Sequence, residues 1–124
     1  MTTTYCTYTE LANETGSGLS QTILEELINQ AEREVNSRLA VAGLSGSAND
    51  TLKVATLKIA TANMLVRYRL DNTKPSGLTI GELSMSDNID EAIRNLKADG
   101  LRIVGEYIKT NFPTKSRRYL TKVN

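Results

Sequence analysis

Apolar side chains recur at a helical spacing in three stretches of this chain. Between residues 20 and 42 they fall at positions i, i+3, i+4 and i+7, which is the stripe of an amphipathic helix. Between residues 50 and 70 they occupy two faces, which predicts a central helix packed against both of the others. The third stretch begins near Asp87, and Pro113 limits how far a helix can continue. The pattern therefore predicts three long helices.

Residues before and after the first long stretch refine this picture. Thr9 to Glu14 can form one short helix, followed by the loop TGSG. Ser20 can act as an N-cap, because its hydroxyl can accept a free first-turn N–H group, and Gly43 can take the left-handed turn that ends the helix. We therefore predict a mainly α fold, a small bundle of three long helices plus a short N-terminal helix.

One segment breaks the helical pattern, the stretch GLTIGELSMSDN between the second and third long helices. Gly81 and Glu82 suit a two-residue hairpin turn whose first central residue is glycine, and pairing the strands outward places the apolar side chains on one face. Because a lone hairpin is marginal in water, this face should rest on its own helices, on another chain, or on both. We therefore predict a β-hairpin insert near residues 77–86. Its candidate subunit-interface residues are Leu78, Ile80, Gly81, Glu82, Leu83 and Met85.

Composition adds limits on fold and location. Aromatic residues make up only 5% of the 124 residues, so aliphatic side chains must build the core of a single domain. Cys6 is the single cysteine and cannot form an internal disulfide. No apolar run approaches the ~20 residues that span a bilayer. The sequence therefore predicts a soluble, intracellular protein with no membrane partner.

Charge is distributed unevenly along the chain. The net charge is +1, but every acidic residue precedes residue 107, whereas residues 109–124 carry five lysines and arginines. Residues 1–34 hold six glutamates against a lone Arg33. We therefore divide the chain into a helical domain, residues 1–108, and a basic C-terminal tail, residues 109–124.

Residue types that support catalysis are scarce. The chain has no histidine, which removes the commonest general base and metal ligand. One cysteine cannot make a zinc site, and Cys6 has no histidine partner to activate it. The carboxylate pairs Glu25–Glu26 and Asp87–Asp90 suit a helix surface and a helix first turn. We therefore predict no enzyme activity, no catalytic residue, no metal and no cofactor.

Nucleic-acid binding is the alternative function. Residues 8–27 resemble a helix-turn-helix superficially, but the second helix would be too long and would present Glu25, Glu26 and Glu32 to phosphates. The basic tail could instead contact a nucleic-acid backbone without reading bases, as in a nonspecific nucleic-acid-binding or regulatory helical protein. Its apolar side chains favour a different role, docking on an acidic, partly apolar protein surface. The candidate docking residues are Lys109, Phe112, Lys115, Arg117, Arg118, Tyr119, Leu120 and Lys122.

The order of these segments resembles a known family. The opening YCTYTEL, the helices ILEELINQAEREVNSRL and LKVATLKIATANMLVRYRL, the insert LTIGELSMS and the last helix IDEAIRNLKADGLRIVGEYI carry the resemblance. They are similar in order and character to the head-tail connector proteins of tailed bacteriophages, also called adaptor or head-completion proteins, of the HK97 and SPP1 types. The resemblance covers roughly residues 5–108, and its most telling part is IGELSMS after a helix ending in RYRL.

This resemblance implies a structural virion protein at the head-tail interface, assembled in the host cytoplasm. Such proteins form a homo-oligomeric ring, usually twelve-fold, between the portal protein and a stopper or tail-completion protein. The ring extends the channel through which packaged DNA passes without sequence-specific contact, and it supports head completion and tail attachment. The C-terminal segment reaches toward the portal. Because a ring joins two different patches of one subunit, the acidic first third and the basic tail are candidates for these patches.

Overall fold

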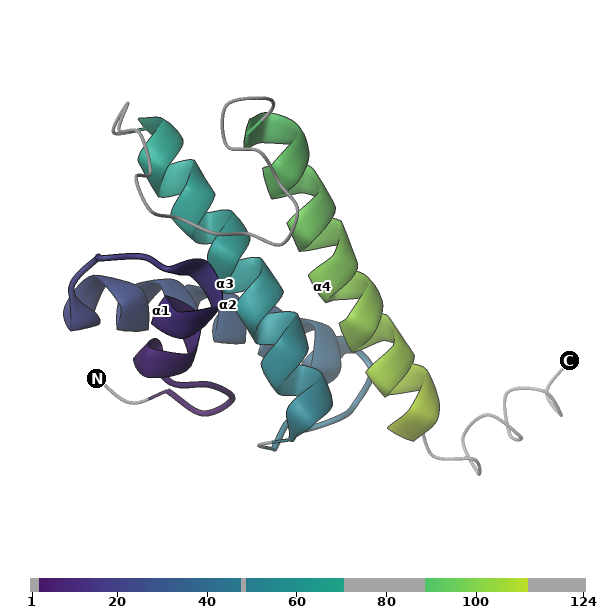
Figure 1. Cartoon of the computed structure of the whole chain (residues 1–124). Coiled ribbons are helices and arrows are strands. Elements are labelled where there is room, and N and C mark those ends of the chain that lie inside the picture. The colour runs from purple at the N-terminus through teal and green to yellow at the C-terminus, as the bar shows by residue number, and fades with distance from the viewer. Residues whose placement is uncertain (1–2, 48, 71–88, 112–124) are drawn as a thin grey trace, which may run out of the picture.

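The described residues form four α-helices (Figure 1). The computed structural model describes residues 3–47, 49–70 and 89–111. The mainly α prediction, with one short helix before three long ones, is confirmed. The helices are α1 (Tyr8–Thr15), α2 (Gln21–Val41), α3 (Asp50–Leu70) and α4 (Ile89–Asn111).

The predicted fold class was wrong in its β-hairpin insert. The part of the chain that the structure describes contains four helices and no strand, so the class is mainly α without a hairpin. The segment to which the hairpin was assigned, residues 77–86, lies outside the described residues. Apolar alternation over so few residues is weak support for a hairpin, because an isolated pair of strands gains little free energy in water. The predicted subunit-interface residues of the hairpin therefore also lie outside the described residues: Leu78, Ile80, Gly81, Glu82, Leu83 and Met85.

Side chains at the helix ends explain where the long helices begin and end. The Ser20 hydroxyl accepts a hydrogen bond from the Ile23 N–H at 3.4 Å, which confirms the predicted cap of α2. Gly43 has a φ of 75°, the left-handed conformation expected just beyond that helix. The Asn49 side chain accepts from the Leu52 N–H at 2.9 Å and caps α3. Local sequence therefore sets these boundaries.

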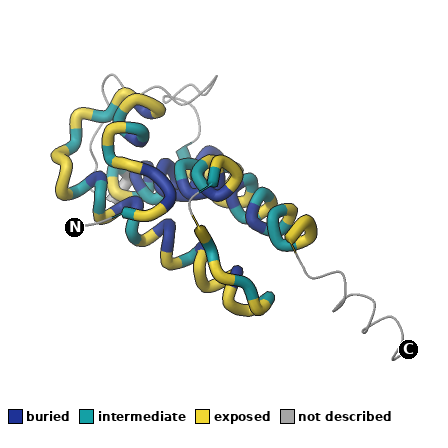
Figure 2. Tube along the Cα trace, turned by 90° about the horizontal axis from the view of Figure 1, so that it is seen from below, coloured by how far each residue is buried: buried dark blue, intermediate teal, exposed yellow. Residues whose placement is uncertain are grey.

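The core forms where α3 meets the other helices. α3 and α4 run antiparallel side by side, while α2 crosses behind α3 and α1 packs on both α2 and α3 (Figure 1). Figure 2 shows buried positions gathered where the helices meet and exposed ones on their outer sides. Gly100 of α4 faces α3, where a Cβ atom would lie 2.6 Å from Ile59 Cγ1 and 3.0 Å from the Ala55 carbonyl oxygen. The missing side chain thus allows α4 to lie close to α3.

One buried carboxylate fixes the N-terminal segment to α2. Glu32 is 5% exposed, and its Oε2 accepts hydrogen bonds from the backbone N–H groups of Thr4 and Tyr5, both at 2.7 Å. The Tyr5 hydroxyl donates to the side-chain oxygen of Asn36, one turn further along α2. Tyr5 and Cys6 thereby join the core. Glu32 has a structural role and is not a surface charge.

Cys6 is expected to be inert in the folded protein. Burial, together with the nearby carboxylates of Glu32 and Glu10, raises the pKa of its thiol to about 12. Because the thiolate is the reactive species, native Cys6 should react at pH 8 about 10³ times more slowly than a free cysteine. Labelling with a maleimide in buffer and in denaturing urea measures this ratio. Rapid labelling of the native protein would contradict the described burial.

Candidate interaction surfaces

The predicted tail is described only at its start. α4 continues to Asn111, so the first three residues of the predicted tail are helical. Lys109 is exposed in the last turn of α4, where a positive charge complements the helix dipole. The structure therefore places one predicted docking residue in the last turn of α4. Outside the described residues lie Phe112, Lys115, Arg117, Arg118, Tyr119, Leu120 and Lys122.

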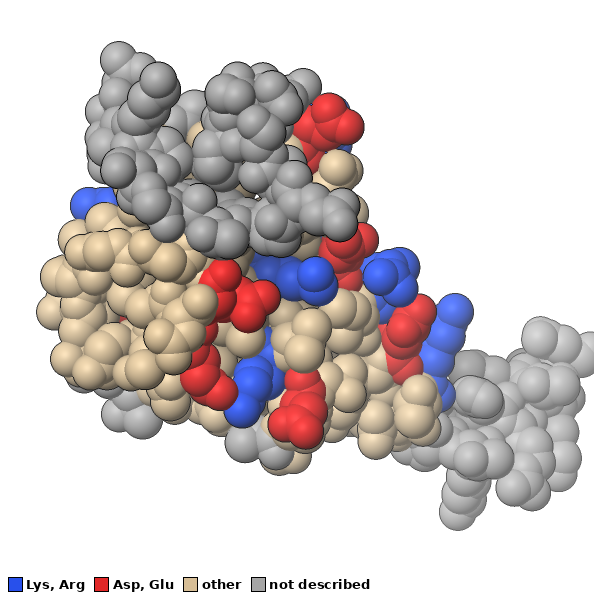
Figure 3. All heavy atoms as spheres, viewed as in Figure 1, with Lys and Arg blue, Asp and Glu red and all other residues tan. Residues whose placement is uncertain are grey.

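Several glutamates of the acidic first third are engaged within the subunit. Glu10 lies 2.8 Å from Lys53 Nζ, whose hydrogen bond lowers the pKa of the Glu10 carboxyl. Glu34 lies 3.5 Å from Lys97, and Glu32 is buried. Figure 3 shows acidic and basic side chains interspersed on the face it presents. Part of the acidic first third, proposed above as a ring patch, is thus engaged in contacts within the subunit.

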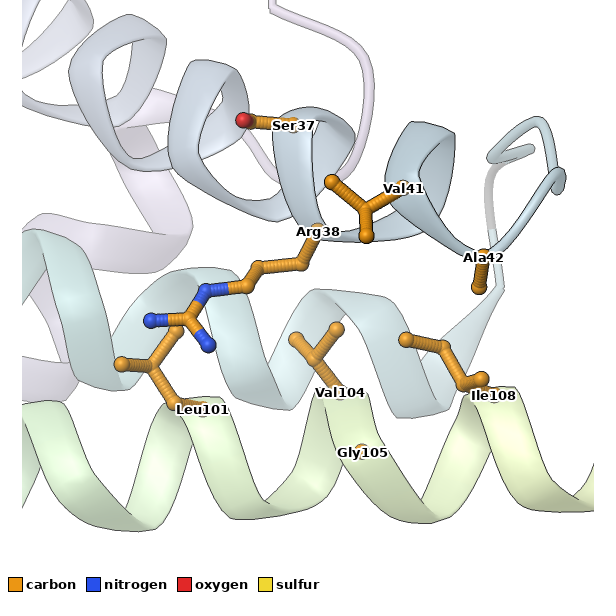
Figure 4. A pocket seen from close by; sticks show the side chains of 8 residues that line it. All are labelled: Ser37, Arg38, Val41, Ala42, Leu101, Val104, Gly105 and Ile108. Atoms are coloured by element: carbon orange, nitrogen blue, oxygen red, sulfur yellow. The ribbon is translucent and has the colours of Figure 1, made fainter.

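A groove runs between α2 and α4, because both helices pack on α3 and touch each other only in part (Figure 4). Its volume is about 440 Å³. Val104 is buried at its base, whereas Val41 on its rim is 89% exposed. We therefore take this groove, with Val41 on its rim, as a candidate interaction surface. The lining residues are Ser37, Arg38, Val41, Ala42, Leu101, Val104, Gly105 and Ile108.

Two groove residues decide what the groove can accept. Gly105 keeps it open, because a Cβ atom there would meet no atom within 4 Å. Arg38 extends along the groove toward Leu101 in Figure 4 and makes no ion pair within the described part of the chain. The groove therefore combines apolar and polar lining groups with the positive charge of Arg38.

A second exposed apolar position lies on α3. Val54 is 44% exposed. At 100° per residue it projects away from the fully buried Leu52 and Ile59. Asp50 precedes it by one turn, so the two side chains share a face, and Asp50 makes no ion pair within the described residues. Lys58 follows Val54 by one turn on the same face, so this surface places Val54 between a negative and a positive charge.

Neither surface was among the predicted interface residues. Val41 and Val54 fall outside the apolar stripes of their helices, which is the one signal that the sequence contained. The groove itself requires α2 and α4 to be neighbours, which periodicity does not reveal. Sequence analysis therefore did not point to these two surfaces.

The described residues were also searched for metal sites and membrane-spanning helices, and the chain was compared with known proteins. Within residues 3–47, 49–70 and 89–111, no three His, Cys, Asp or Glu side chains gather to hold a metal ion. Among the described helices, none has both the length and the apolar character needed to cross a bilayer. Comparisons with family models, curated proteins and solved structures find no match.

Proposed function

We propose that this chain is a structural virion protein, a ring-forming head-tail connector that docks on the portal. The observation that carries the proposal is that two large apolar side chains, Val41 on α2 and Val54 on α3, are exposed on different parts of the described subunit. A closed ring needs two unlike patches that meet between neighbouring copies. The resemblance in segment order over residues 5–108 suggests which ring it is.

The proposed action is mechanical. A ring of these subunits would extend the portal channel, help to retain packaged DNA and offer a platform for a stopper or tail-completion protein. Its basic tail would reach the portal. DNA would pass through without sequence-specific contact, and no residue would act as a catalyst.

The alternative, a nonspecific nucleic-acid-binding or regulatory protein, has less support. Phosphate binding requires clustered lysines and arginines. Figure 3 shows acids interspersed among the bases on the face it presents. The bases that favour this alternative belong to the tail, of which only Lys109 is described.

Quantitative mass spectrometry of purified phage particles from the source of this sequence tests the proposal. We expect about one copy of this chain per portal subunit, since a ring seated on the portal is a stoichiometric part of the particle. Absence of the chain from intact particles would overturn the proposal. Salt-sensitive binding of the purified protein to DNA would then favour the alternative.

A further inference from the structure

We infer that neighbouring subunits join head to tail, with the start of α3 of one copy docked in the α2–α4 groove of the next. Val54 enters the groove beside Val41, and Asp50 pairs with Arg38. This inference rests on the proposed ring and names the contact that would build it. Its occupant is a second copy of this chain.

The apolar parts of the two surfaces match. The groove offers Val41 on its rim and Val104 at its base, and Gly105 leaves space for an incoming side chain. Val54 is a compact side chain that protrudes from a helix, as an occupant of such a groove must. Burying both exposed valines removes apolar surface from water at one contact.

The charges match as well. Asp50 precedes Val54 by four residues, and Arg38 precedes Val41 by three, so each charge lies one helical turn from its valine. Among the described residues of the same chain, no carboxylate lies within ion-pair distance of Arg38 and no cation within that distance of Asp50, although the Asp50 charge contributes to raising the pKa of Lys53. Opposite charges beside an apolar contact fix its register and disfavour other pairings.

Other occupants fit the groove less well. The basic tail would bring lysines and arginines to Arg38, and like charges oppose docking. A two-fold contact of groove on groove would bring two copies of Arg38 to the same interface. Docking of Val54 joins two unlike surfaces and brings Asp50 as well as Lys58 to the groove, and because the two surfaces differ, the contact can repeat from copy to copy.

Site-directed cross-linking tests this contact. The full chain carrying Val41→Cys and Val54→Cys is treated with a short bismaleimide at neutral pH and at high protein concentration. The native Cys6 is buried, and its raised thiol pKa keeps it unreactive, so the wild-type chain reports the background. We expect the double variant to give a ladder of dimers, trimers and larger species, and a mixture of the two single variants to give a dimer.

Control variants distinguish the proposed contact from nonspecific cross-linking and from other contacts. Gln30→Cys replaces Val41→Cys in a matched variant, because Gln30 is exposed on α2 but does not line the groove. Cross-linking no stronger than in this control would overturn the inference. Efficient dimers from Val41→Cys alone would also overturn it, in favour of a two-fold contact. A ladder that forms in a chain ending at Asn111 but not in the full chain would overturn the inference and assign the groove to the tail.

Two further variants test the groove and the charges directly. Gly105→Leu should fill the groove and lower the cross-linked fraction about tenfold, with helical content and melting temperature retained. Arg38→Glu or Asp50→Lys alone should lower it about fivefold, and the double exchange should restore it. An unchanged fraction in Gly105→Leu, or no restoration by the double exchange, would contradict the proposed pairing.

The two proposals can fail separately. A ladder from a chain that is absent from phage particles would support the contact and overturn the connector function. Particles that contain the chain, combined with no specific ladder, would support the function and overturn this contact.

Discussion

Replacing Gly100 with alanine is expected to lower the free energy of unfolding by about 1–3 kcal/mol, although alanine is the better helix former. The new Cβ atom would lie 2.6 Å from Ile59 Cγ1 and 3.0 Å from the Ala55 carbonyl oxygen. The Ile59 side chain can shift, but the carbonyl belongs to the backbone of α3. Relief therefore requires the two helices to move apart, which weakens packing along their length. Urea unfolding followed by circular dichroism measures the change.

Gly105 provides the matched control on the same helix. A Cβ atom there would meet nothing within 4 Å, so Gly105→Ala should gain the helix preference of alanine, about 0.5–1 kcal/mol. Opposite signs for the two substitutions would show that close approach distinguishes the two glycines. A Gly100→Ala protein as stable as Gly105→Ala would contradict the described spacing of α3 and α4.

Removing the Glu32 carboxylate is expected to destabilise the protein by about 3 kcal/mol in Glu32→Ala. The substitution leaves the N–H groups of Thr4 and Tyr5 without their acceptor, and the Tyr5 residue is buried. Glu32→Gln keeps an acceptor oxygen but loses the charge that strengthens both hydrogen bonds, so its cost should be smaller, about 1 kcal/mol. Denaturant unfolding gives both values.

Hydrogen exchange separates this local role from a general loss of stability. In Glu32→Gln the Tyr5 amide should lose more protection than amides in the centre of α3, because its own hydrogen bond is weakened. Glu26→Ala is the control, since Glu26 is exposed on the same helix and should change stability by less than about 0.5 kcal/mol. An equally small effect of Glu32→Ala would rule out the structural role of this carboxylate.

Local signals in the sequence were enough to predict the helices. The predicted first long helix, residues 20–42, differs from α2 by one residue at each end, because Ser20 and Gly43 mark its limits. Glu32 lies within the apolar stripe of α2, four residues after Ile28 and three before Val35, so its burial left a trace in the pattern. Its hydrogen-bond partners lie 27 and 28 residues away, and no periodicity shows them.

The interaction surfaces were harder to predict, because they too depend on residues that lie far apart in the sequence. The close approach of α4 to α3 at Gly100 arises from tertiary packing, which the spacing of apolar residues does not show. The hairpin was inferred from a short alternating pattern, which specifies a strand pair poorly without knowledge of what covers it. The groove depends on α2 and α4 lying together on α3. Surfaces built by neighbouring helices become visible only once the helices are packed.

The open space at Gly105 has a consequence for how such a protein can change over time. A position where a side chain meets no neighbour can vary without disturbing the core, yet each added carbon would make the α2–α4 groove shallower. Glycine, alanine and leucine would thus give deep, intermediate and filled grooves on the same stable subunit. Related chains could diverge in which partner they accept through this one residue, so that assemblies made in one cell stay separate while their subunits keep a common fold.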